Sequence, residues 1–173
     1  MPVPVMIRPT TADDIDAIGA IYAEYVDSGV ATFELVAPDR EELLRRFGAV
    51  ASAGLPYLTA VLDGEVAGYA YCAPWKTRPA YRHTVEDSVY VAPHAVGRGV
   101  GGALLDAVLD ACRQEGIRQV IAVIVDHDAD ASLALHRQRG FTDAGRLSAV
   151  GFKHGKWLDT LLLQRSLDSP AGR

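Results

Sequence analysis

The residues best suited to bind a reactive ligand are four clustered glycines, Gly97, Gly99, Gly101 and Gly102, which follow an apolar run at residues 89–91. Glycine allows the backbone to approach a ligand closely and to adopt positive φ. The sequence after the cluster is typical of a helix, whose first turn offers unpaired N–H groups and a partial positive charge. A strand, a glycine loop and a helix start in this order predict a cradle for a pyrophosphate.

Three classes of phosphorylated ligand compete for this loop. A nucleoside-triphosphate loop needs Lys and then Ser or Thr after its last glycine, but Ala103 and Leu104 stand there, which argues against a kinase or ATPase. A dinucleotide site is a weaker match, because residues 92–96 separate the strand from the first glycine and repeated βα units are lacking. The third class is coenzyme A.

The strand, the Pro-containing link, the glycines and the helix together resemble the acetyl-coenzyme A signature of the GNAT family of N-acetyltransferases. Residues 7–18 are similar to that family's first strand and helix, and residues 132–141 to its last helix and turn. Residues 71–81 and 151–157 resemble the phosphinothricin and methionine sulfoximine acetyltransferase subgroup. The resemblance implies an α/β (α+β) fold, with a mixed, mostly antiparallel sheet of about six to seven strands flanked by about four helices.

The same resemblance implies that acetyl-coenzyme A is the cofactor. The chain departs from the family at Val96, where Gln or Arg is usual, and at Ala129, where Asn is common. We expect these departures to affect cofactor affinity without removing the chemistry. The residues that the resemblance assigns to the cofactor are Val89, Tyr90, Val91, Val96, Gly97, Arg98, Gly99, Val100, Gly101, Gly102 and Ser132.

Acetyl transfer to an amine requires a neutral nitrogen, polarisation of the thioester carbonyl and a proton for the departing thiolate. The resemblance places the subgroup's catalytic glutamate at Glu86, which we expect to act as the base, through water. Asp87 should point to the opposite face of its strand, so that only one of the two carboxylates lines the site. An exposed strand carboxylate is the alternative for Glu86.

The candidate general acid is His136, one turn after Ser132, where relatives of the family place a Tyr or His near the coenzyme sulfur. A histidine on the helix surface is the alternative interpretation. The resemblance assigns the oxyanion contact to a backbone N–H at residues 89–91.

An amino-acid substrate offers a carboxylate, which a guanidinium clasps in bidentate fashion, and Arg78 is the candidate. In the resembling subgroup, Lys153 and His154 correspond to a hairpin tip that reaches the active-site mouth of the neighbouring subunit, which implies a homodimer. Without the resemblance they form a polar turn, and packing on the sheet is the alternative for the aromatic residues of the set. The residues predicted to bind the acceptor are Phe33, Glu34, Trp75, Arg78, Tyr81, Lys153 and His154.

At 173 residues the chain suits one domain, which we expect over residues 1–167, followed by a flexible tail at residues 168–173. Its 17 basic and 22 acidic residues give a net charge of −5, which argues against a nucleic-acid surface. No run approaches the ~20 apolar residues that span a membrane, and no targeting segment is recognised. Small metabolites are the expected partners, in preference to nucleic acid or a membrane.

Cys72 and Cys112 both stand in apolar stretches. This usage fits a reducing compartment better than a disulfide scaffold, so the expected location is cytoplasmic. Asp126, His127 and Asp128 are adjacent, but clustered Asp in a turn more often caps the backbone, and no separate ligand set accompanies them. We therefore predict no catalytic metal.

Hydrophobic periodicity predicts alternating helices and strands without internal repeats. Asp63 and Gly64, between two apolar runs, are a strong hairpin signal, and the continuous apolar run at residues 120–125 is typical of a strand buried on both faces. Helices are expected at residues 11–26, 38–53, from the glycine loop to Gly116, and at 130–139. Strands are expected at residues 57–62, 65–73, 83–91, 120–125, 141–150 and 157–167.

The leading hypothesis is an acetyl-coenzyme A-dependent N-acetyltransferase that acts on the α-amino group of a small amino acid or analogue, by direct attack in a ternary complex. Phosphinothricin, methionine sulfoximine and methionine sulfone are acceptors of the expected type. One alternative transfers acetyl to another amine, such as a protein N-terminus, a polyamine or an aminoglycoside. Another is a non-catalytic acyl-coenzyme A-binding sensor, and a dinucleotide-dependent oxidoreductase ranks third.

Overall fold

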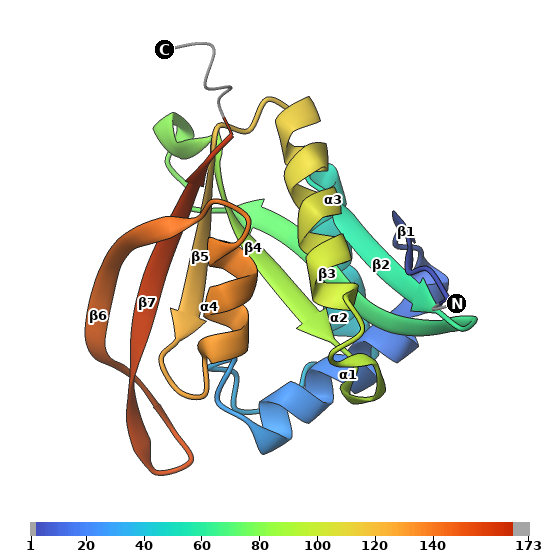
Figure 1. The fold of residues 1–173 in the computed structure, drawn as a ribbon, viewed down its shortest axis with the longest axis horizontal. Coiled ribbons are helices and arrows are strands. Elements are labelled where there is room, and N and C mark those ends of the chain that lie inside the picture. Colours follow the sequence, from blue (N-terminus) through green and yellow to red (C-terminus); the bar gives the residue numbers. More distant parts are fainter. Residues whose placement is uncertain (1–2, 168–173) are drawn as a thin grey trace.

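The computed structural model describes residues 3–167, which form one seven-stranded sheet with helices on both faces (Figure 1). The helices are α1 (Ile15–Ser28), α2 (Arg40–Ser52), α3 (Val100–Gln114) and α4 (Asp130–Arg137). The strands are β1 (Met6–Pro9), β2 (Tyr57–Leu62), β3 (Glu65–Pro74), β4 (Thr84–Val91), β5 (Gln119–Val125), β6 (Thr142–Lys153) and β7 (Lys156–Ser166).

The strands follow the order β1-β2-β3-β4-β5-β7-β6, and all neighbours are antiparallel except β4 and β5. The predicted fold class is confirmed. Asp63 and Gly64 have φ of 54° and 79° and join β2 to β3, as the hairpin signal predicts. The predicted C-terminal tail, residues 168–173, lies outside the described residues.

Two helices cover each face of the sheet. The ring of Tyr90 on β4 lies 5.1 and 5.2 Å from those of Tyr22 and Tyr25 on α1, so it points to the face that α1 and α2 cover. Its neighbour Val91 lies against Gly101 of α3, on the face that α3 and α4 cover. Successive residues of β4 therefore serve opposite faces, as strand alternation requires.

The sheet splits along its middle, between the two parallel strands. β4 and β5 pair only over their first residues, Thr84 to Gln119 through Glu86 to Ile121, and then diverge. Beyond this point β5 keeps its partner β7, whereas β4 keeps its partner β3. The split therefore leaves an opening between the second halves of β4 and β5.

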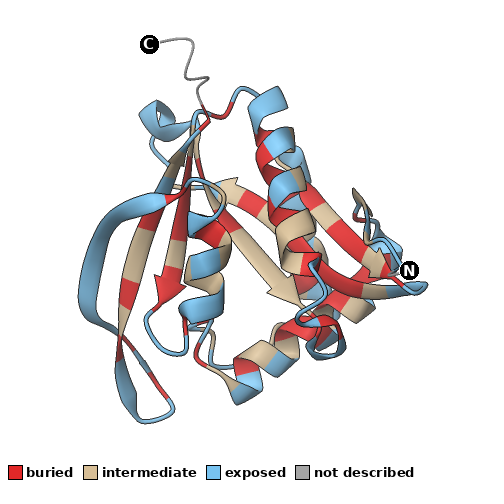
Figure 2. Cartoon of the chain, in the orientation of Figure 1, coloured by how far each residue is buried: buried red, intermediate tan, exposed pale blue. Residues whose placement is uncertain are grey.

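The hairpin of β6 and β7 forms the outer edge of the molecule (Figure 1). Residues 142–150 of β6 are exposed, which Figure 2 shows as a continuous pale-blue strand, whereas Lys153 at its end is buried. Two irregularities in the β6–β7 register bend this strand. Within residues 3–167, no helix is long and apolar enough to cross a membrane.

Candidate active site

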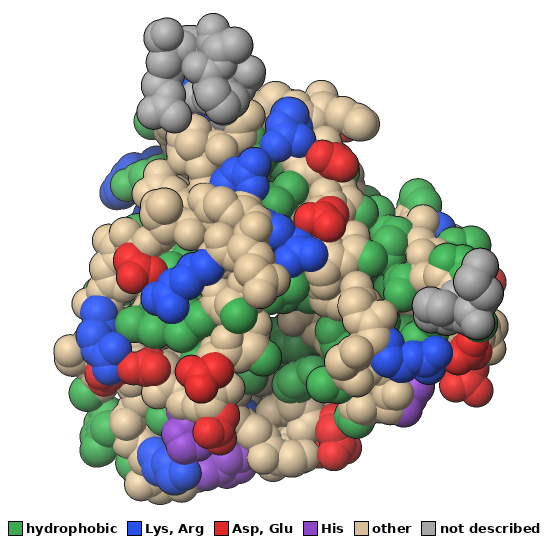
Figure 3. Space-filling model, viewed as in Figure 1, with side chains coloured by type: hydrophobic (Ala, Val, Ile, Leu, Met, Phe, Trp, Pro, Cys, Tyr) green, Lys and Arg blue, Asp and Glu red, His purple; other side chains and the backbone are tan. Residues whose placement is uncertain are grey.

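A cavity of about 630 Å³ occupies the split between β4 and β5. Figure 3 shows the surface hollowed near the centre of this view, with hydrophobic side chains around the hollow. Such a volume is in the range of small-molecule sites. The cavity is lined by the glycine loop, the predicted catalytic residues Glu86 and His136, and one predicted acceptor residue, Phe33. The full lining is Tyr25, residues 31–33, 86–91, 95–97, 99–102, 122–125, 127–129, 131–132, 135–136 and Thr160.

The glycine loop forms one end of the cavity. Gly97 and Gly99 both have φ of 81°, a region that other residues rarely adopt, and Gly99 directly precedes α3. The first helical bond of α3 runs from the N–H of Ala103 to the carbonyl of Gly99. By helix geometry, the N–H groups of the preceding first turn lack helical partners and suit an anion.

Within the described part of the chain, the edge of β4 that faces the split has no strand partner beyond Glu86. The N–H of Ala92 bonds to Ala67 on β3, at 2.8 Å, so the backbone of the preceding residue, Val91, faces the opposite direction. The carbonyl of Val91 accepts from the hydroxyl of Tyr25 at 2.7 Å instead of from a strand. Since β4 and β5 have diverged here, the backbone of alternate β4 residues is free to bond an extended ligand.

Two side-chain atoms also point to a ligand. Within residues 3–167, Asp87 Oδ1 and Thr160 Oγ1 are the buried side-chain oxygen or nitrogen atoms that lack a hydrogen-bond partner. Both residues line the cavity. Buried polar groups without partners are costly and rare in proteins, so their common location indicates a site that receives polar groups.

Glu86 lines the cavity from β4, two residues before Ser88 and four before Tyr90. By alternation its side chain shares the face of Tyr90, toward α1 and α2. Burial raises the pKa of Glu86, and the charge of Asp87 adds to this effect. A carboxylate with a raised pKa is better matched to proton transfer near neutral pH than an ordinary one.

Asp87 also lines the cavity, which corrects the prediction that only one of the two carboxylates faces the site. Its side chain does point to the opposite face from Glu86, since Asp87 Oδ2 lies 2.8 Å from Nε2 of His136 on α4. The cavity passes through the gap between the strands, so it is lined from both faces of the sheet. Strand alternation thus predicted the directions of the two side chains correctly. The prediction that the cavity lies on one face of the sheet only was wrong.

His136 is held on both ring nitrogens. Nδ1 lies 2.8 Å from the carbonyl oxygen of Ser132, which only accepts, so Nδ1 carries a hydrogen. Nε2 faces Asp87, and the two side chains are only 5% and 1% exposed. Burial by itself lowers the pKa of His136, but the hydrogen bond and charge of Asp87 outweigh it, so the pKa lies above 6.5. The contact with Asp87 therefore favours the protonated form of His136.

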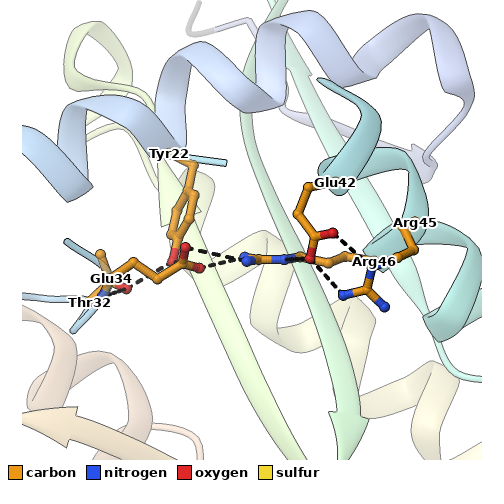
Figure 4. A network of polar contacts seen from close by, with 6 residues as sticks. All are labelled: Tyr22, Thr32, Glu34, Glu42, Arg45 and Arg46. Carbon is orange, nitrogen blue, oxygen red and sulfur yellow. Dashed lines mark hydrogen bonds and ion pairs between the residues drawn. The ribbon is translucent and has the colours of Figure 1, made fainter. Parts of the chain in front are cut away.

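The predicted residues Phe33 and Glu34 are neighbours in the loop between α1 and α2, but their side chains have different surroundings. Phe33 lines the cavity, whereas Glu34 points away and joins a network between α1 and α2 (Figure 4). Glu34 accepts from the hydroxyl of Tyr22 at 2.8 Å and from the guanidinium of Arg46. These contacts outweigh burial and lower the pKa of Glu34. Its carboxylate anchors the loop, which is a different role from the predicted contact with the acceptor.

The loop that carries Trp75, Arg78 and Tyr81 joins the end of β3 to the start of β4 and lies outside the lining of the cavity. Arg78 is exposed, and Tyr81 is 41% exposed. Trp75 is half-buried, with the ammonium of Lys76 5.2 Å from its ring centre. The structure therefore does not bring these three predicted residues into the cavity that holds Glu86.

Three further predicted residues lie outside the lining of the cavity. Arg98 is exposed and pairs with Asp63 at 3.2 Å, whereas the loop glycines around it line the cavity. Lys153 is buried and bonds to Thr32 of its own chain, which corrects the expectation that it reaches toward a neighbouring subunit. His154 forms the exposed tip of the β6–β7 hairpin, with φ of 51°.

Sequence reasoning missed Asp87, Thr160 and Tyr25 as residues of the site. Tyr25 and Thr160 follow ordinary helix and strand patterns, so no local signal marks them. Asp87 carried one usable signal, because it shares a strand face with the apolar residues Val85 and Val89, and an ionisable side chain on such a face needs a partner.

The profile of the acetyltransferase (GNAT) family matches residues 19–141, which include the glycine loop, both strands of the split and α4. The chain belongs to the GNAT family. A phosphinothricin N-acetyltransferase from Alcaligenes faecalis is 49% identical over 163 residues, 94% of this chain and 83% of the relative. An L-methionine sulfoximine/L-methionine sulfone acetyltransferase from Pseudomonas paraeruginosa is 37% identical over 163 residues, 94% of each chain.

A solved structure agrees with these relatives. The crystal structure of a GNAT superfamily phosphinothricin acetyltransferase from Sinorhizobium meliloti, in complex with acetyl-coenzyme A, matches with a TM-score of 0.91 at 44% identity. The match covers 98% of this chain and 92% of that one. The protein is therefore an N-acetyltransferase that uses acetyl-coenzyme A.

The residues of this GNAT chain fit that cofactor. The loop of Gly97 and Gly99 and the first turn of α3 suit its pyrophosphate, and the free edge of β4 suits the amides of its pantetheine arm. Ser132 and His136 on α4 line the same cavity. Ala129, where the family commonly carries Asn, also lines it, and the buried oxygens Asp87 Oδ1 and Thr160 Oγ1 are available to polar groups of the cofactor.

Proposed function

We propose that this enzyme acetylates the α-amino group of a small amino acid or analogue, of the phosphinothricin, methionine sulfoximine or methionine sulfone type. The acceptors named for its relatives support this class. The observation that carries the proposal is that one cavity is lined from both faces of the sheet, with the glycine loop at one end and Glu86 on the α1 face. Donor and acceptor can then meet in a ternary complex, with direct attack of the amine.

In this mechanism Glu86 acts as the base, through water. Its raised pKa lets it accept a proton from an ammonium or from the attacking nitrogen and release it to solvent. Bound acetyl-coenzyme A supplies an activated acetyl thioester. Backbone N–H groups of β4 at the split, among residues 89–91, are the candidates to polarise the carbonyl oxygen.

His136 remains the candidate acid, and we assign it this role as one unit with Asp87. The nitrogen takes the acetyl group and loses a proton toward Glu86, while the C–S bond breaks and its electron pair stays on sulfur. The Asp87–His136 pair can deliver its proton to that thiolate and recover one from solvent after product release. Nδ1 donates to the carbonyl of Ser132, so Nε2 is the nitrogen that must deliver the proton. This geometry requires Nε2 to leave its hydrogen bond with Asp87 and to form one with the coenzyme sulfur.

The test is thiol release from acetyl-coenzyme A with a panel of methionine sulfoximine, methionine sulfone, phosphinothricin, ordinary amino acids and polyamines. We expect Glu86→Gln to lower kcat by about 10²–10⁴-fold on the preferred acceptor, the usual contribution of a general base. Its affinity for coenzyme A should be unchanged. Glu65→Gln is the matched control, because Glu65 is an exposed strand carboxylate on β3.

Full activity of Glu86→Gln would refute the assignment of the base. Turnover confined to polyamines would replace the proposed acceptor class. Binding of coenzyme A without turnover on any amine would favour a sensor.

We also propose that the enzyme is a cytoplasmic homodimer. The hairpin supports the second part, because Phe152 and Trp157 lie side by side with ring centres 4.9 Å apart and remain 55% and 71% exposed. Paired exposed aromatic residues on an exposed strand are typical of an interface. The buried thiols of Cys72 and Cys112, with sulfur atoms 3.4 Å apart, suit a reducing compartment.

A further inference from the structure

Lys153 is a buried cation at the end of β6. It is only 2% exposed, and its Nζ donates to the backbone carbonyl of Thr32 at 2.9 Å. Its partner across the hairpin, Lys156, is exposed, as lysines normally are. Two lysines of the same turn therefore have opposite environments, and only Lys153 reaches the loop between α1 and α2.

The burial of this ammonium has a cost. Burial lowers the pKa of Lys153, and the negative charges of Asp27 and Glu34 oppose that shift. A buried lysine is rare unless a partner compensates for its lost hydration. Here the compensation comes from the carbonyl of Thr32 and the carboxylate of Glu34 in the loop, and from the carboxylate of Asp27 near the end of α1.

The contact is made to the part of the loop that lines the cavity. Residues 31–33 form this wall, on the same side as Glu86. Thr32 is held twice, by Lys153 at its carbonyl and by the hydroxyl of Tyr22 at its own hydroxyl, 2.8 Å away. The ring of Phe33 lies so close over Gly151 of β6 that a β-carbon there would overlap it.

We propose that Lys153 is a positioning residue for the acceptor: its ammonium fixes the carbonyl of Thr32, and thereby the wall of residues 31–33 against which the acceptor binds. The proposal rests on the proposed function for the identity of the acceptor. Lys153 itself does not line the cavity, so it acts through the loop. The β6–β7 hairpin thus shapes the acceptor side of its own chain.

The experiment compares Lys153→Met, which keeps the length of the side chain and removes its N–H donors, with Lys153→Arg, which keeps a cation and donors. Lys156→Met is the matched control on the same hairpin. For Lys153→Met we expect KM for the amine to rise about tenfold, with kcat changed less than about threefold, the effect of losing one charged hydrogen bond. Affinity for acetyl-coenzyme A should be unchanged, and Lys153→Arg should recover part of the loss.

Hydrogen exchange gives a readout that needs no acceptor. In Lys153→Met, amides at residues 30–36 should exchange faster, while those of α3 and β4 keep their rates. This measurement separates the proposal from the proposed function, since it holds even if no amine of the panel reacts. The inference is overturned if the loop exchanges as in the wild type, if KM is unchanged, or if Lys156→Met has the same effects.

Discussion

At the scale of residues, two adjacent carboxylates acquire different roles from their surroundings. Glu86 lies on the α1 face without a cationic partner among the contacts of the described residues, and burial raises its pKa. Asp87 lies on the α4 face, with Oδ2 2.8 Å from Nε2 of His136. Glu86 is thus suited to accept a proton, whereas Asp87 is suited to stabilise the protonated form of His136.

The Asp87–His136 pair predicts a pH dependence of stability. Because the pKa of His136 in the folded protein lies above its ordinary value of 6.5, the stabilisation is fully present below pH 6.5. It is lost as pH rises through the folded-state pKa. In Asp87→Asn, this decline should flatten, and the free energy of unfolding at pH 6 should fall by about 1–3 kcal/mol.

Chemical denaturation at a series of pH values measures the effect. Asp110→Asn, which removes an exposed carboxylate from α3, is the control and should reproduce the wild-type pH profile. A wild-type stability that rises with pH above 6.5, with no difference in Asp87→Asn, would contradict the stabilisation of protonated His136 by Asp87.

At the scale of elements, the cradle depends on close packing of α3 against the sheet. A β-carbon at Gly68 of β3 would lie 2.7 Å from the carbonyl oxygen of Tyr90, and 3.1 Å from the side chains of Leu104 and Val100. Neither a strand backbone nor a buried helix side chain can move freely. Gly68 therefore sets the distance between β3, β4 and the start of α3.

We expect Gly68→Ala to destabilise the fold by about 1–3 kcal/mol, the usual cost of an added methyl group in a packed core. It should also weaken binding of coenzyme A, since α3 carries the glycine loop. Thermal unfolding and calorimetric titration measure the two effects. Gly48→Ala is the control: nothing lies near its β-carbon, and helix propensity predicts a gain of about 1 kcal/mol. Equal behaviour of the two variants would contradict the packing argument.

At the scale of the whole molecule, the loop between α1 and α2 meets the β6–β7 hairpin at the acceptor side of the cavity. The loop between α1 and α2 is anchored at Glu34 to the helices and at Thr32 to the β6–β7 hairpin. Val30 of the same loop packs with Val125 and Leu158. Near its turn, the hairpin therefore supports the site through the buried side chain of Lys153 and exposes the aromatic side chains of Phe152 and Trp157.

This arrangement predicts that the exposed aromatic pair controls assembly. Replacement of both Phe152 and Trp157 by Ser should convert the proposed dimer to a monomer in analytical ultracentrifugation. Folding should be retained, because both side chains are largely exposed. A wild-type protein that sediments as a monomer at all concentrations would remove the basis for this prediction. The control is Leu35→Ser, because Leu35 is an exposed apolar residue in the loop between α1 and α2.

The sequence by itself determined the elements and the cradle, because these depend on neighbouring residues. Turn chemistry at Asp63 and Gly64 placed one hairpin, and the bond from the Thr11 N–H to Asp14 at 2.8 Å placed the entry to α1. The spacing of Gly97 and Gly99 before an amphipathic helix was sufficient to indicate an anion cradle, since a loop and a helix start form an anion site locally. The family resemblance then identified the ligand as acetyl-coenzyme A.

Only the tertiary structure decided the partners of the charged side chains. Asp87 and His136 are 49 residues apart, and Lys153 and Thr32 are 121 apart, so no local pattern relates them. The split between β4 and β5 also arises from strand pairing, and it opened the cavity to both faces of the sheet. Burial and long-range pairing decide that Asp87 has a histidine partner and that the ammonium of Lys153 is buried. These environments depend on residues distant in the sequence that pack around each group.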